Sequence, residues 1–166
     1  MKKELEDKIV NDFPGMFKHR DNLKASLMAF GFECNDGWFD LIHNLCRDIN
    51  AFYNGKIPEQ FYVQQVKEKF GGLRFYVSCA PEEVFNMIHA AEGHSYSICE
   101  NCGKEHQPSE GEYTSFYRDA LPWIVTLCDE CLDKHIAKIY NRIRKANEDY
   151  ISNWQKEHNA PFVKGV

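Results

Sequence analysis

The sequence predicts an α+β fold with N-terminal helices, a β-hairpin, and a cysteine-rich segment that ends in a long C-terminal helix. Apolar residues recur every three or four positions early in the chain, the period changes to two around a Gly-Gly pair, and two Cys-x-x-Cys pairs precede a long amphipathic stretch. At 166 residues and 43% hydrophobic content, a single compact domain over 1–166 is expected. Its subregions are 1–56 (helical), 60–94 (hairpin plus helix) and 95–158 (cysteine-rich segment with the long helix).

The first thirty residues predict two short helices. Pro14-Gly15 breaks the helical pattern, and Asp21 is a suitable N-cap for a second helix through "NLKASLMAF", which Gly31 would end. An apolar stripe in the first helix is formed by Leu5, Ile9 and Val10.

The stretch "NDGWFDLIHNLCRDINAF" predicts the clearest helix of the N-terminal half. Asp36 can cap it, and Asn54-Gly55 would stop it. Cys46 beside its apolar face and Cys34 before it are expected to be buried apolar residues and not ligands. The expected buried face consists of Trp38, Leu41, Ile42, Leu45, Ile49 and Phe52.

The stretches "FYVQQVKEKF" and "LRFYVSC" predict two strands on either side of Gly71-Gly72. If those glycines form a two-residue turn, Phe70 pairs with Leu73. Glu68 then falls on the apolar side, which makes it an edge residue or indicates a different register. The helix "PEEVFNMIHAAEG" follows, with Pro81 in its first turn and Gly93 at its end. The expected apolar face of the hairpin consists of Tyr62, Val66, Phe70, Leu73, Phe75 and Val77.

The other face of the hairpin is the dense basic patch that the sequence predicts. It carries Lys67, Lys69, Arg74 and Tyr76. These residues could contact phosphates or an acidic partner, with Tyr76 available for stacking. The alternative is an ordinary solvated face of an antiparallel sheet.

Four of the seven cysteines form a metal-ligand pattern. Cys99, Cys102, Cys128 and Cys131 have the spacing Cys-x2-Cys-x25-Cys-x2-Cys, which suits one tetrahedral zinc ion per chain. Because site formation and folding are coupled, we expect removal of the metal to cause unfolding.

The arrangement of this segment resembles a treble-clef zinc finger. Gly103 permits a tight turn after the first pair, "EYTSFYR" and "PWIVTL" look like hairpin arms, and the second pair opens a helix from about Asp129. The resemblance implies a structural ion, because a full sulfur shell has no open position. His106 and His135 are the alternative ligands.

A catalytic use of this scaffold is not expected. Treble-clef nucleases of the HNH type need a histidine base on the first hairpin and a metal ligand after the second cysteine pair. Here the hairpin arms contain no histidine, and Leu132 follows Cys131. A degenerate HNH-type nuclease is therefore the remote alternative, and we expect no enzyme.

Net charge and hydropathy argue against two further classes of protein, those that bind polyanions over their whole surface and those that span a membrane. The net charge of −5 argues against a surface that grips a polyanion throughout, and no apolar run approaches the ~20 residues of a membrane span. A cytoplasmic protein is expected. The last helix carries a coiled-coil-like seam that predicts either packing within the domain or a homodimer: Ile136, Tyr140, Ile143, Asn147, Tyr150 and Trp154.

Four strings, "GFECNDGWFDLI", "VKEKFGGLRFYV", "CENCG" and "WIVTLCDEC", resemble a group of small uncharacterised proteins of tailed bacteriophages and prophages. The resemblance implies a viral protein in the host cytoplasm and brings no known activity. We therefore expect a structural-zinc protein that binds a host macromolecule, most simply a protein. Inhibition of a bacterial defence system such as CRISPR would fit that origin. The competing class is a nucleic-acid-binding module, to which Arg142, Arg144 and Lys145 would add charge.

Overall fold

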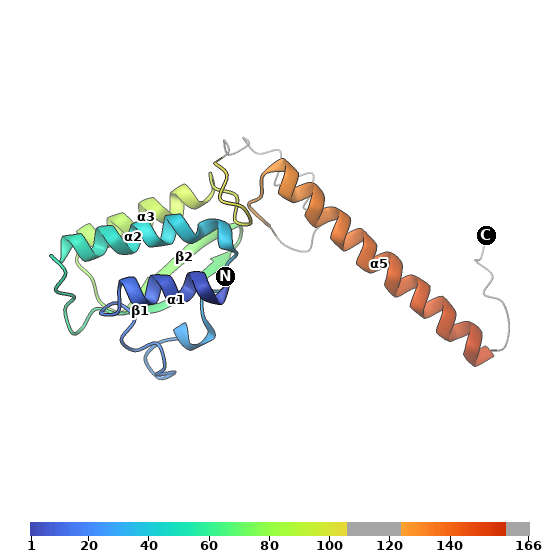
Figure 1. Cartoon of the computed structure of the whole chain (residues 1–166), viewed down its shortest axis with the longest axis horizontal. Helices are drawn as coiled ribbons and strands as arrows, with labels where there is room; N and C mark the ends of the chain where they lie inside the picture. The colour runs from blue at the N-terminus through green and yellow to red at the C-terminus, as the bar shows by residue number, and fades with distance from the viewer. Residues whose placement is uncertain (106–123, 159–166) are drawn as a thin grey trace. The chain divides into compact units, whose positions relative to one another are not determined.

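The computed structural model describes residues 1–105 and 124–158. Contacts divide the chain into two units, Met1–Cys128 and Asp129–Val166. That both belong to a single domain stays a prediction. The predicted order of N-terminal helices, hairpin, cysteine cluster and long C-terminal helix is confirmed (Figure 1). The described elements are α1 (Lys3–Asp12), η1 (Met28–Phe30), η2 (Asp36–Trp38), α2 (Phe39–Phe52), β1 (Val63–Lys69), β2 (Gly72–Val77), α3 (Glu82–Ser95) and α5 (Asp129–His158).

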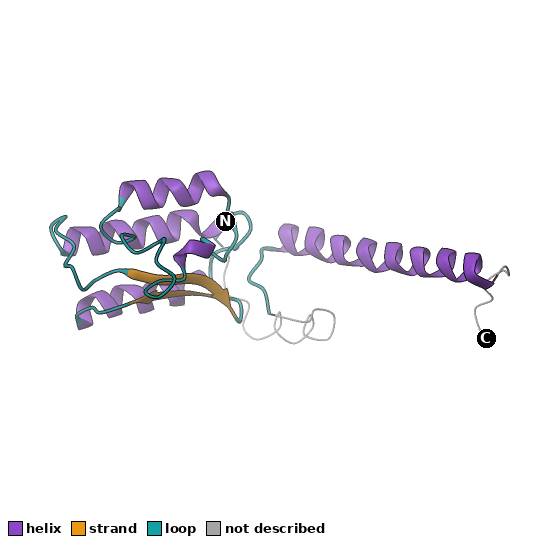
Figure 2. Ribbon diagram, turned by 90° about the horizontal axis from the view of Figure 1, so that it is seen from below, coloured by secondary structure: helices purple, strands orange, loops and turns teal. Residues whose placement is uncertain are grey.

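The core of the first unit lies between the helices and the hairpin. Helix α2 contacts both α1 and α3, and α3 also contacts β2. Figure 1 shows α2 and α3 side by side, and Figure 2 shows the hairpin as a curved two-stranded ribbon beside the helices. The largest fully buried side chains come from all of these parts of the unit and include Ile9, Trp38, Ile42, Phe61, Leu73 and Val84.

Helix α2 buries nearly the whole face that its sequence predicts. Trp38, at its N-cap, and the aliphatic residues of the stripe are buried, but Phe52 is 39% exposed, so its placement in the core was wrong. Phe52 is the last residue of the helix, where Asn54 and Gly55 turn the chain with positive φ. Cys34 and Cys46 are buried, as expected.

Asp36 does not cap α2, which corrects the prediction. It lies in η2, and neither η2 nor α2 has a side-chain cap. Instead, Asp36 Oδ1 accepts a hydrogen bond from the backbone N–H of Lys2 at 2.7 Å, and its Oδ2 lies 3.0 Å from Lys2 Nζ. Asp36 therefore accepts a hydrogen bond from the backbone at the start of α1. Lys2 is distant in sequence, so the local capping pattern could not reveal this partner.

The second predicted helix is absent from residues 21–31. This segment consists of turns and the single 3-10 turn η1. Its polar groups bond to β1: Ser26 Oγ donates to Val63 O at 3.0 Å, and Leu27 N donates to Gln64 O at 2.7 Å. Tertiary hydrogen bonds to the strand therefore replace a helical ladder here.

The hairpin is present, but its register differs from the prediction by two residues. Glu68 pairs with Leu73, and the turn is Phe70-Gly71, both with positive φ. Phe70 is thus 67% exposed at the turn and not on the apolar face. Because a shift of two keeps each side chain on its face, the predicted division into an apolar and a basic face is unaffected.

A bulge between Val63 and Gln65 changes the start of β1. Val63 and Phe61 are fully buried, while Tyr62 is only half-buried and packs against His19. The placement of Tyr62 on the apolar face was therefore wrong, because the extra residue of the bulge reverses the alternation at this end of the strand.

Helix α3 begins after Pro81, which is its N-cap and not a residue of its first turn, and it continues through Gly93 to Ser95. The extension has a role, because Ser95 Oγ accepts a hydrogen bond from Leu73 N at 2.9 Å. One turn earlier, Glu92 Oε1 accepts from Phe75 N at 2.9 Å. Side chains of α3 therefore accept hydrogen bonds from N–H groups at the outer edge of β2. Without them, these N–H groups would be open to pairing with another strand.

Candidate metal centre

The first cysteine pair lies in a tight turn that we call the knuckle, residues 98–105. Ile98 and Glu105 form an antiparallel bridge at its base, and Cys99 N donates to Lys104 O at 2.9 Å. Gly103, with φ 76°, donates from its N–H to Cys99 O at 2.9 Å. The glycine is required there because a left-handed residue closes the turn.

The knuckle is attached to the start of α2. Gly37 N donates to Glu100 O at 2.8 Å, Asn35 N donates to Glu100 Oε1 at 2.9 Å, and Trp38 Nε1 donates to Ile98 O at 3.0 Å. These three bonds hold the first cysteine pair on the hydrophobic core. Burial raises the pKa of the Glu100 carboxyl, and the Asn35 N–H opposes that rise.

Gly37 is a site residue that sequence reasoning missed. A Cβ atom there would meet the carbonyl oxygen of Cys99 and would lie 2.5 Å from Gly103 N and 2.6 Å from Glu100 O. Only glycine therefore lets the backbone of the knuckle approach this closely. The available signal was a glycine next to Asp36, at the beginning of a predicted helix, where glycine is not needed for the helix itself.

The second cysteine pair lies where it was predicted, at the start of the long helix. Cys128 directly precedes α5, and Cys131 is in its first turn. The strand that was predicted directly before this pair is not seen in the described residues. Residues 124–127 carry no strand assignment, although Thr126 O accepts a hydrogen bond from Glu100 N at 2.9 Å. The first predicted arm, residues 112–118, lies outside the described residues.

The same segment also touches the hairpin turn. Thr126 Oγ1 donates to Gly71 O at 2.5 Å. A Cβ on Gly71 would lie 2.9 Å from Ile124 Cγ2 and 3.1 Å from Thr126 Oγ1. Gly71 is therefore needed both for its φ of +77° and for this close approach. Gly71 therefore connects the hairpin turn to the segment before the second cysteine pair, whereas Gly72 faces Tyr96 and Arg74.

The four predicted sulfurs come together. The Sγ atoms of Cys99, Cys102, Cys128 and Cys131 all lie within 4.8 Å of one another, and those of Cys102 and Cys128 are 3.7 Å apart. Four thiolates at ~2.3 Å around a tetrahedral ion would be about 3.8 Å apart. The cluster can therefore hold a metal ion, and its cysteines are free of disulfides.

Burial and backbone contacts affect the thiol of Cys99 in opposite directions. Burial raises its pKa, whereas hydrogen bonds from the backbone of Cys128 and Cys102 lower it. A buried thiolate needs a nearby positive charge, which a bound cation supplies. Cys102 is the exposed member, and the other three are buried.

Of the two alternative histidine ligands, the structure describes only His135, and His135 is not part of this cluster. His106 lies outside the described residues. His135 follows Cys131 by about one turn of α5, and its Nε2 is buried without a hydrogen-bond partner in the described part of the chain. In residues 1–105 and 124–158, the four cysteines form the one group of three or more His, Cys, Asp or Glu side chains that converges in this way.

The predicted basic face keeps its four members on one side of the hairpin. Lys67 pairs directly with Arg74, and Lys67 Nζ lies 5.8 Å from the ring centroid of Tyr76. Arg74 donates to Leu73 O at 2.6 Å and to Tyr96 Oη at 3.3 Å. Lys69 lies over the Phe70 ring. Arg74 is thus engaged within the fold, and a binding role for this face stays a prediction.

Comparison with known protein families, curated proteins and solved structures finds no match for this chain. Within the described residues, none of the helices has the length and apolar character needed to cross a membrane.

Proposed function

We propose that the chain is a zinc-stapled protein that acts by binding a protein partner and not by catalysis. The convergence of the four cysteine Sγ atoms carries this proposal. Four thiolates complete the tetrahedral shell that zinc favours, and a complete shell leaves no position for a substrate or an activated water. One ion per chain would hold the knuckle to the segment that precedes α5.

Charge supports a protein over a nucleic acid as the partner. The chain carries a net charge of −5, so a polyanion meets overall repulsion. Of the cations that the nucleic-acid alternative would use, Arg74 bonds to Tyr96, and Arg144 lies 3.9 Å from Glu148 in an i,i+4 pair. The Glu148 carboxylate opposes the charge of Arg144, and the bond to Tyr96 occupies a guanidinium donor of Arg74 that a phosphate would need.

The resemblance to phage and prophage proteins extends the proposal. On that basis the partner is a protein of a bacterial host, and inhibition of a defence system such as CRISPR is the role that fits. This extension is supported by the resemblance alone.

Elemental analysis tests the metal. Protein purified without chelator is expected to contain one zinc per chain, and Cys99→Ser and Cys131→Ser are expected to lose it. Cys79→Ser is the matched control, since Cys79 is exposed and outside the cluster. Absence of zinc from the wild type would contradict the proposal.

Capture from a nuclease-treated bacterial lysate tests the binding function. The full chain as bait is expected to retain a protein whose purified form rebinds with saturable affinity. Binding of labelled DNA or RNA that weakens steeply with salt would instead support the nucleic-acid module. Digestion of plasmid in Mg²⁺ or Mn²⁺ would overturn the non-catalytic assignment.

A further inference from the structure

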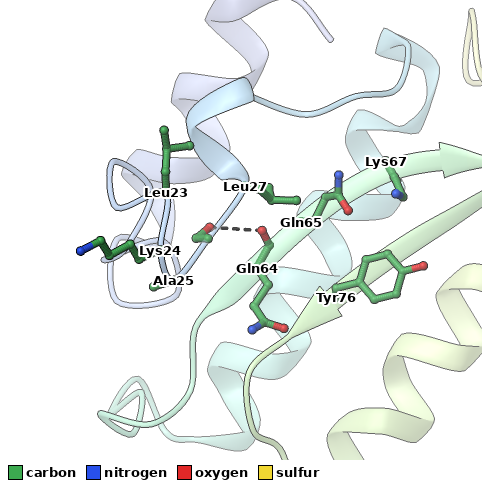
Figure 3. Close-up of a pocket in the computed structure, with 9 residues that line it drawn as sticks. Leu23, Lys24, Ala25, Leu27, Gln64, Gln65, Lys67 and Tyr76 are labelled. Atoms are coloured by element: carbon green, nitrogen blue, oxygen red, sulfur yellow. Dashed lines mark hydrogen bonds between the residues drawn. The ribbon is translucent and has the colours of Figure 1, made fainter.

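A pocket of about 400 Å³ lies between the turn segment 23–27 and the hairpin. Figure 3 shows Leu23, Lys24 and Leu27 on the turn segment, and Gln65, Lys67 and Tyr76 on the hairpin. Its volume falls in the range of small ligand-binding sites. Two members of the predicted basic face, Lys67 and Tyr76, therefore line this open pocket.

The turn-segment wall of the pocket is held in place by hydrogen bonds. Ser26 is buried, and its Oγ lies within hydrogen-bond distance of two carbonyl oxygens of the hairpin, Val63 O at 3.0 Å and Gln64 O at 3.2 Å. Leu27 N also donates to Gln64 O at 2.7 Å. The Lys24 N–H bonds to Asn22 Oδ1 at 3.1 Å. The pocket is therefore built into the packing of the segment against β1.

The lining combines apolar surface with positive charge. Leu23 is 58% exposed and Leu27 is 42% exposed, although both are large apolar residues. Lys24 and Lys67 supply two ammonium groups, and no carboxylate lines the pocket. Among the described residues, neither lysine has an ion-pair partner within 4.0 Å.

One acidic residue, Glu33, lies beside the pocket, because it pairs with Lys67 in an isolated parallel β-bridge. Glu33 Oε2 accepts a hydrogen bond from Gln65 Nε2 at 2.7 Å, and Glu33 does not line the pocket. In a chain of net charge −5, a lined site with two cations and no anion is complementary to an anionic ligand.

We propose that this pocket binds an acidic peptide segment of a partner protein, in which an apolar side chain neighbours a carboxylate. The inference rests on the proposed protein-binding function. The apolar side chain would contact Leu23 and Leu27, and carboxylates on either side of it would approach Lys24 and Lys67, which Figure 3 shows on opposite sides of Leu27. Lys67 Nζ already lies over the Tyr76 ring, so a nucleobase would have to displace the ammonium before it could stack there.

Titration of the labelled full-length protein, followed by amide chemical shifts, tests the site. The probe is the acetylated and amidated hexapeptide Asp-Leu-Asp-Leu-Asp-Phe, and its counterpart with Asn in place of each Asp is the matched probe. We expect the acidic peptide to shift amides of residues 23–27, 64–67 and 76, and to bind about tenfold more weakly with Lys67→Glu or Lys24→Glu. Lys56→Glu makes the same charge change at an exposed residue outside the pocket and should leave binding unchanged.

Equal shifts with the acidic and Asn peptides, or no shift at these amides at millimolar peptide, would overturn the inference. Shifts of the same amides by a ten-nucleotide oligothymidylate, with none by the peptide, would assign the pocket to nucleic acid and also overturn it. If Lys67→Glu and Lys24→Glu still bind the partner captured from lysate as tightly as the wild type does, the pocket assignment fails while the proposed function stands.

Discussion

Gly37 shows how one residue can determine the position of a metal site. Its hydrogen atom faces the backbone of the knuckle, where a methyl group would meet the carbonyl oxygens of Cys99 and Glu100. Backbone atoms cannot move aside as a flexible side chain can. The hydrogen bond from Gly37 N to Glu100 O depends on the same close approach.

We therefore expect Gly37→Ala to lower the free energy of unfolding of the zinc-loaded protein by about 1–3 kcal/mol, the usual cost of overpacking. Gly93→Ala is the matched control, because Gly93 lies inside α3 and a Cβ there meets nothing within 4 Å. That change should be stabilising by about 0.5–1 kcal/mol, since alanine favours the helix. Urea unfolding at fixed zinc concentration measures both. A Gly37→Ala variant as stable as the wild type would show that the knuckle does not dock here.

The buried thiol of Cys46 gives a prediction about pH. Burial raises its pKa in the folded state well above the ~8.5 of an unfolded thiol. Below the unfolded pKa of ~8.5 the thiol is protonated in both states, so it contributes no pH dependence to the free energy of unfolding. At higher pH the unfolded chain releases this proton while the folded chain keeps it, so the free energy of unfolding falls as pH rises.

Cys46→Ala removes this contribution. Between pH 9 and 10, we expect the wild type to lose stability faster than the variant by about 1.4 kcal/mol per pH unit. Urea unfolding of both proteins at each pH measures the difference, in which the pH dependence of the metal centre cancels. Parallel pH profiles would contradict the buried, protonated thiol.

At the scale of elements, the hairpin shows what the sequence could and could not predict. Between the bulge and the turn, alternation identified both faces, because a side chain's face there depends on whether its position is odd or even. It failed at Tyr62, beyond the bulge, and at Phe70, in the turn. The register was wrong, because the turn residues are Phe70-Gly71, and Gly71 packs against Ile124 and Thr126 from a segment more than fifty residues away. That contact is not visible in the local pattern.

The same reason explains the helix that was predicted from Asp21 and is absent. Its sequence is compatible with a helix, but Ser26 and Leu27 form hydrogen bonds with β1 instead. By contrast, α2 and the cysteine cluster were predicted well. In α2 the burial pattern is local to the helix, and in the cluster the ligand spacing reflects the geometry of a single ion.

Helix α5 allows a prediction about self-association. Tyr140 and Ile143 lie on the predicted seam, and their side chains are 68% and 56% exposed. Large apolar side chains that are exposed along one line of a helix indicate a surface for association. The charged pairs Lys134–Glu130 and Arg144–Glu148 lie off that seam and can remain solvated when it is covered. We expect two copies to pair through the seam.

Light scattering over a concentration series should then give a mass that rises from monomer to dimer. Ile143→Glu is expected to remain monomeric, because two charges would face each other in the seam. Lys138→Glu, an exposed change on the same helix but off the seam, should dimerise like the wild type. A monomer mass for the wild type at every concentration would refute the pairing.

At the scale of the whole molecule, the hydrophobic core and the cysteine cluster are distinct sources of stability. The core cluster runs from Ile9 to Ile98 and draws on α1, α2, the hairpin and α3, and none of the four clustered cysteines belongs to it. The metal site, by contrast, joins the knuckle to Cys128 and to the first turn of α5. Loss of the ion should therefore affect the two parts unequally, which refines the expectation of simple unfolding.

Hydrogen exchange before and after chelation would resolve the two parts. We expect the amides of Cys99, Glu100 and Gly103 to lose protection, because their acceptors Lys104 O, Thr126 O and Cys99 O belong to segments that the ion holds together. The amide of Val63, which donates to Met16 O at 2.8 Å within the core unit, should stay protected. Loss of protection at all of these amides would make the metal essential to the entire fold. Unchanged exchange at Glu100 would contradict a structural ion, because its acceptor, Thr126 O, lies on the segment that leads to the second cysteine pair.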